Sequence, residues 1–131
     1  VIGGKNTLYI PATERLTGYA NWLITHDYGN SAFRAYPVSG TGVGAPTISD
    51  IGSVHSVSTN ESAKGYMKLG PRNLLAVALN DGSNNFVELF DFVNTTGAIT
   101  NFRSVTIPSI GGTQVYGLEF SPGGRKLYVT M

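Results

Sequence analysis

The chain has 131 residues, which is enough for one domain with a buried core. Only 13% of the residues are charged, and nine Lys and Arg against eight Asp and Glu leave a net charge of +1 that is spread evenly along the sequence. Because no basic stripe is present, nucleic acid is not expected as a partner, and the absence of cysteine excludes disulfides, thiolate metal sites and a cysteine nucleophile.

The predicted elements are all β-strands. In chain order they lie at about 7–10, 21–26, 32–38 and 46–51, then at 64–69, 74–79, 85–92 and 99–107, and finally at 115–120 and 126–130. Clusters of Gly, Asn, Asp and Pro separate them, among them DYGNS, GPRN, NDGSN, NTTG and SPGG, and such clusters favour turns. No stretch of ten or more residues sustains a helical period, so the sequence predicts an all-β protein.

The strands recur with an offset of 51 to 53 residues. Aligning GYMKLGPRNLLAVAL with YGLEFSPGGRKLYVTM places Pro71 on Pro122, and aligning NWLITHDYGNSAFRAYPV with NLLAVALNDGSNNFVELFDF places Phe33 on Phe86. A four-stranded propeller blade takes roughly 40 to 50 residues, so the offset is typical of a long blade. The predicted units are 1–56, 57–110 and the incomplete 111–131.

SPGGRKLYVTM resembles the S-P-D-G-K-x-L-Y-V hairpin of β-propellers of the YVTN and WD40-like kind. The run from about residue 13 to 131 is similar to propeller modules of large secreted Bacteroidetes surface proteins. The resemblance implies four-stranded antiparallel blades, and Gly70 and Gly123 depart from it where the hairpin usually has Ser and Asp.

Two and a half blades do not close a ring, since closed propellers generally have about four to eight. We therefore expect a partial propeller whose open ends are covered by other blades of the same protein, by further copies or by partner chains. The chain starts with Val1 and shows no signal peptide, which favours a segment of a longer protein. The low charge and the 17 glycines favour a secreted or cell-surface location.

Two sets of side chains are candidate binding residues. Lys68 and Glu119 occupy equivalent positions on innermost strands and form either a charged channel lining or an ion pair between blades. His26 and Asp27 close a strand and His55 lies in a connection between units, where propellers place ligand groups, although a structural hydrogen-bonding role is the simpler interpretation. No metal-ligand spacing and no catalytic motif is present, so we expect neither a metal nor a cofactor.

Other polar and aromatic residues have simpler interpretations. The segment NDGSNNFVE offers Asp81, Ser83, Asn85 and Glu88 as oxygen ligands for calcium, but a hairpin turn explains it better. The aromatic residues Trp22, Tyr28, Phe33 and Tyr36 suggest a ligand platform, whereas strand alternation predicts that Trp22 and Phe33 are buried between blades.

The expected function is non-catalytic: a binding or structural propeller module that presents rim loops to a protein or glycan. The predicted rim loops are 27–31, 39–46, 52–63, 80–85 and 93–98. One alternative is a propeller hydrolase or lactonase, which requires His26, His55 or Glu119 to converge at a channel mouth. Another is a self-assembling component whose open blades pair between copies. No membrane span is expected, because the longest apolar run, 74–79, is too short.

Overall fold

The computed structural model describes the backbone of residues 6–9 and the whole of residues 21–55 and 64–131. Its strands are β1 (Asn6–Tyr9), β2 (Asn21–His26), β3 (Ala32–Ser39), β4 (Gly42–Val43), β5 (Thr47–Asp50), β6 (Met67–Leu69), β7 (Leu74–Asn80), β8 (Asn85–Val93), β9 (Ala98–Ile107), β10 (Leu118–Phe120) and β11 (Leu127–Val129). These residues contain no helix, so the predicted all-β class is confirmed.

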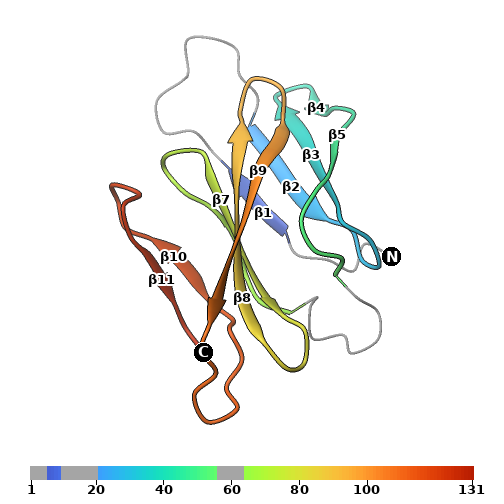
Figure 1. Ribbon diagram of the computed structural model, residues 1–131. Helices are drawn as coiled ribbons and strands as arrows, with labels where there is room; N and C mark the ends of the chain where they lie inside the picture. Colours follow the sequence, from blue (N-terminus) through green and yellow to red (C-terminus); the bar gives the residue numbers. More distant parts are fainter. Residues whose placement is uncertain (1–5, 10–20, 56–63) are drawn as a thin grey trace.

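The strands form three antiparallel sheets that lie beside one another (Figure 1). The first sheet has the order β1-β2-β3-β4, with β5 also paired to β3, the second has the order β6-β7-β8-β9, and the third is the β10-β11 hairpin. Strand β6 contacts both β1 and β10, so the first strands of the three sheets are neighbours. The second sheet therefore lies between the other two (Figure 1).

Three of the observed strands differ from the prediction by more than one residue at an end. The short β4 was not predicted, and β6 and β10 begin three residues later than the sequence indicates. The residues just before β6 and β10 still bond to their own hairpins, since the Ala78 amide donates to the Tyr66 carbonyl and the Tyr116 amide donates to the Thr130 carbonyl, both at 2.9 Å. Tyr66 also bonds to the third sheet, because its amide donates to the Tyr116 carbonyl at 2.8 Å. The predicted boundary at residue 56 lies outside the described residues.

Aligned residues occupy matching places in the strand pairing. In the β6-β7 hairpin Lys68 pairs with Ala76, and in the β10-β11 hairpin Glu119 pairs with Tyr128. Both turns follow the same pattern, with Pro71 or Pro122 as the second residue after the strand ends. Pairing between second and third strands also agrees, since Leu23 faces Tyr36 in the first sheet and Ala76 faces Leu89 in the second.

An aromatic core joins the first and second sheets. Trp22 meets the edge of Phe92 with ring centroids 5.7 Å apart, and Phe33 meets Phe90 at 5.0 Å. Each such side chain contributes roughly 1.5–3 kcal/mol by burial, and an edge-to-face pair adds about 0.5–1.5 kcal/mol. Trp22 and Phe33 are buried, which confirms that they lie inside the protein and not on an exposed platform.

A smaller apolar core joins the second and third sheets. Its buried members are Ala76, Ala78, Val87, Val115, Leu118 and Phe120. A Cβ atom at Gly70 would lie 2.5 Å from Cδ2 of Phe120, so the ring occupies the space that a serine side chain would need. This contact gives a physical reason for glycine at position 70, where the resembling hairpins have Ser.

Candidate functional site

The two histidines lie against each other at one end of the first sheet. His26 is the last residue of β2, and His55 lies in the connection that leaves the first sheet. Their rings stack with centroids 3.5 Å apart and planes 15° apart, and each residue is only 1% exposed. The structure thus brings together two of the candidate residues and buries both.

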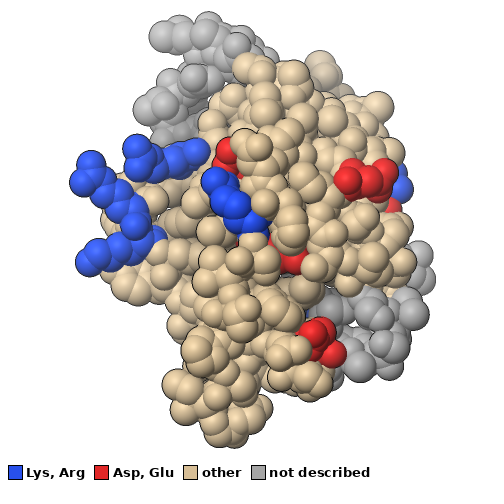
Figure 2. Space-filling view, in the orientation of Figure 1, with Lys and Arg blue, Asp and Glu red and all other residues tan. Residues whose placement is uncertain are grey.

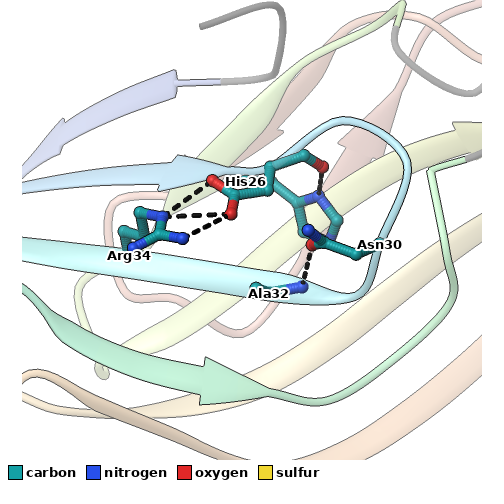
Figure 3. A network of polar contacts seen from close by, with 5 residues as sticks. His26, Asn30, Ala32 and Arg34 are labelled. Atoms are coloured by element: carbon teal, nitrogen blue, oxygen red, sulfur yellow. Dashed lines mark hydrogen bonds and ion pairs between the residues drawn. The ribbon is translucent and has the colours of Figure 1, made fainter.

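The turn at 27–31 holds the pair in place. The Gly29 amide donates to the His55 carbonyl at 2.9 Å, and the His55 amide donates to the Asn30 carbonyl at 3.2 Å. Nδ1 of His26 donates to the Asp27 carbonyl at 2.6 Å, because a carbonyl oxygen only accepts (Figure 3). The Asn30 side chain closes the turn by accepting the Ala32 amide at 2.7 Å. Backbone contacts therefore fix where His55 lies.

Asp27 is occupied by an ion pair. Arg34 on β3 grips the carboxylate with two nitrogens at 2.8–3.0 Å (Figure 3). The hydrogen bonds from this guanidinium lower the pKa of Asp27 from its ordinary 3.8, and its positive charge acts in the same direction. A bidentate pair of this kind fixes orientation. Asp27 is thus a structural anchor beside His26.

Lys68 and Glu119 meet as an ion pair, with Nζ of Lys68 2.7 Å from Oε2 of Glu119. The hydrogen bond from Lys68 lowers the pKa of Glu119. The pair joins β6 to β10, whereas His26 ends β2 on the other side of the second sheet (Figure 1). Glu119 therefore does not converge with the histidines. The candidate residues form two separate clusters, one around His26 and the other at the ion pair of Lys68 with Glu119.

An open groove lies beside Glu119, and the sequence did not single it out. Tyr66, Tyr116 and Tyr128 line it together with Glu119 and Thr130, and its volume is about 310 Å³. The three tyrosines are each more than half exposed. The signal was present in the alternation of the last strand, because Tyr128 lies opposite Glu119 and both side chains point away from the second sheet.

The NDGSNNFVE segment forms a turn. The Asp81 carboxylate accepts the amides of Ser83 at 2.9 Å and Asn84 at 2.7 Å, and these bonds lower its pKa. Asn85 is buried and accepts the Val115 amide at 2.9 Å. Glu88, only 1% exposed, accepts the Ser53 amide at 3.4 Å. The side-chain oxygens of Asp81, Asn85 and Glu88 thus serve different partners.

In the described part of the chain no three His, Asp or Glu side chains are placed to hold a metal ion. None of the residues that the structure describes form a helix with the length and apolar character that a membrane crossing requires. Comparisons with protein-family models, curated proteins and solved structures find no match.

Proposed function

We propose that this chain is a non-catalytic binding or structural module built of propeller-type blades and belongs to a secreted or cell-surface protein. Supporting observations are the three sheets stacked side by side, their adjacent first strands and the matching residue pairs of the β6-β7 and β10-β11 hairpins. In this interpretation the β10-β11 hairpin is the inner half of a third blade.

One comparison within the molecule carries the proposal. Lys68 and Ala76 lie on the face of the second sheet that the third sheet covers, and Ala76 is fully buried. Their counterparts Glu119 and Tyr128 lie on the outer face of the third sheet, where Tyr128 is 57% exposed. Further strands would cover this face as the third sheet covers the second. They come from other blades of the same protein or from a partner chain.

Recognition is assigned to the loops at the edges of the sheets, because a rigid stack fixes their positions. The loops 27–31, 39–46, 80–85 and 93–98 lie within the described residues, whereas 52–63 is described only as far as His55. A protein or a glycan is the proposed ligand. A hydrolase is disfavoured because the histidine pair is buried and Glu119 lies elsewhere.

The test is to extend the chain with its own strands. Val129 at the end of β11 corresponds to Val77 in β7, so Thr130 and Met131 correspond to Ala78 and Leu79. Residues 80–131 can therefore be appended directly after Met131. The extension supplies the two outer strands of the third sheet and a further hairpin. We expect Tyr116 and Tyr128 to become protected from nitration by tetranitromethane, whereas Tyr28, 36% exposed at the far sheet, reacts as before.

The control extension carries Asp in place of the appended copies of Leu118 and Phe120, the two residues that cover the second sheet in the original chain. It should leave both tyrosines reactive. Equal nitration of Tyr116 and Tyr128 in the original and extended chains would count against stacked blades. Light scattering on the original chain tests the self-assembling alternative, because a strictly monomeric chain at high concentration removes it.

A further inference from the structure

Three cations that are far apart in the sequence lie together at one edge of the stack. Arg72 is in the turn between β6 and β7, and Arg125 and Lys126 are in the turn between β10 and β11. Figure 2 shows Lys and Arg side chains gathered at the end where the β10-β11 hairpin lies in Figure 1, with no Asp or Glu among them in that view. The even spread of charge along the sequence is therefore not an even spread in space.

Contact between the two turns brings these charges together. A Cβ atom at Gly124 would lie 2.9 Å from Cγ and 3.2 Å from Cδ of Arg72, so the arginine stem lies across the glycine backbone. Gly124 also has φ of +64°, a conformation that favours glycine. Arg72 thereby reaches from the second sheet over the turn of the third.

These cations are available to a ligand. The ion pairs within the described residues join Arg34 to Asp27, Lys68 to Glu119 and Arg103 to Asp91, and none includes Arg72, Arg125 or Lys126. All three residues are exposed. Arginine presents a planar fork that matches carboxylate and sulfate oxygens, and lysine adds a compact charge.

We propose that Arg72, Arg125 and Lys126, named here the cationic edge, bind an acidic polysaccharide that runs along the stack of sheets. The proposed binding depends only on the charged residues of the two turns, so it does not require the sheets to be propeller blades. It goes beyond the loops assigned above, because neither turn is among them.

Chemistry and composition favour an acidic polysaccharide. Its sulfate or carboxylate groups match the planar guanidinium groups of Arg72 and Arg125. Single-stranded nucleic acid uses aromatic side chains for base stacking, and the turns 70–73 and 121–126 contain none.

Binding is measured by titration calorimetry with heparin, polygalacturonate and neutral dextran, followed by competition with poly(U). We expect heparin, polygalacturonate or both to bind, and dextran not to bind. Binding of heparin alone would indicate recognition of sulfate, and binding of polygalacturonate would indicate recognition of carboxylate. Arg72→Gln and Arg125→Gln should each weaken binding roughly tenfold and lower the slope of log affinity against log salt by about one. Arg103→Gln, with the same change of charge on exposed β9, should bind as the original chain does.

Geometry is tested without a change of charge. Gly124→Ala displaces the Arg72 stem and should weaken binding, whereas Gly123→Ala, with nothing within 4 Å of its Cβ position, should not. Circular dichroism confirms that each variant is folded. The proposal is overturned if neither acidic polysaccharide binds, or if dextran binds as tightly as they do. It is also overturned if Arg103→Gln weakens binding as much as Arg72→Gln, or if poly(U) binds more tightly than the polysaccharide that it displaces.

Discussion

At the scale of single residues, Gly97 is set directly against the indole ring of Trp22. Its φ is +77°, and a Cβ atom would lie 2.6 Å from Cζ3 of Trp22 and 3.2 Å from Cβ of Ala35. Gly97→Ala should therefore lower the free energy of unfolding by about 2–4 kcal/mol, through backbone strain and displacement of the indole.

Gly111→Ala is the matched control for this substitution. Gly111 has φ of +63° and open space around its Cβ position. The variant therefore has the backbone strain but no steric clash, and its free energy of unfolding should fall by only about 1 kcal/mol. Urea unfolding of the two variants measures the difference. Equal losses in both would mean that the Trp22 contact is unimportant for stability.

Asp27 makes stability depend on pH. Its pKa in the folded protein is lowered from 3.8 by Arg34, so its contribution is present above that ordinary value and is lost as the pH falls through the folded pKa. Asp27→Asn should be less stable than the original chain at pH 7, and the two should converge as the pH falls below the folded pKa of Asp27. Thermal unfolding midpoints between pH 7 and pH 2 measure this.

Asp81, Asp91 and Glu119 also have lowered pKa values, so the Asp27→Asn variant keeps part of the acid dependence. The difference between the unfolding midpoints of the original chain and of Asp27→Asn should become smaller as the pH falls. If the difference in midpoint stayed constant from pH 7 to pH 2, the ion pair with Arg34 would not be the source of the effect.

At the scale of elements, the β10-β11 hairpin depends on Phe120 for its attachment to the second sheet. Phe120 is 8% exposed and fills the space above Gly70. Phe120→Ala should cost about 3–5 kcal/mol and release the hairpin, so amide exchange should rise in β10 and β11 while β2 and β3 stay protected.

Phe102→Ala on β9 provides the comparison, because that ring is 44% exposed and the substitution leaves little cavity. It should change the unfolding free energy much less. Exchange that rises uniformly through all three sheets of Phe120→Ala would show that the hairpin does not open as a separate unit.

Most of the strands were predictable, since turns rich in Gly, Pro and Asn mark their ends and alternation marks their faces. The β2 bounds agree with the prediction at both ends, and β8 and β9 agree within one residue. The starts of β6 and β10 were predicted three residues too early, because alternation does not mark where regular pairing begins. Tyr66 and Tyr116 still bond to Ala78 and Thr130, but the regular ladders begin only at Met67 and Leu118.

The candidate site was predictable in part. Lys68 and Glu119 could be paired because their sequence offset places them at equivalent points of neighbouring hairpins, and the structure shows the ion pair. The stacking of His26 on His55 could not be predicted, because the path of the connection after Asp50 decides it. Burial of Glu88 was also missed, since a carboxylate in an alternating strand normally predicts an exposed position.

At the scale of the whole molecule, the three sheets differ in how much of them is covered. The second sheet is packed on both faces, and β7 is buried from Leu75 to Asn80. The third sheet is packed on one face and leaves the tyrosine groove open on the other. The blade interpretation stays a prediction, and the extended chain is its direct test because it adds the strands that would cover that groove.

The irregularity in β9 has a consequence for solubility. Between Leu89 and Asp91 the pairing of β8 with β9 shifts, and Asn101 takes φ of 55° while its side chain donates to Asp91 at 2.7 Å. Strand β9 ends the second sheet, and its exposed ladder would otherwise offer a straight template to a foreign strand. A bulge bends and twists that template. The bulge in the β9 backbone thereby disfavours pairing of this sheet edge with a strand of another molecule.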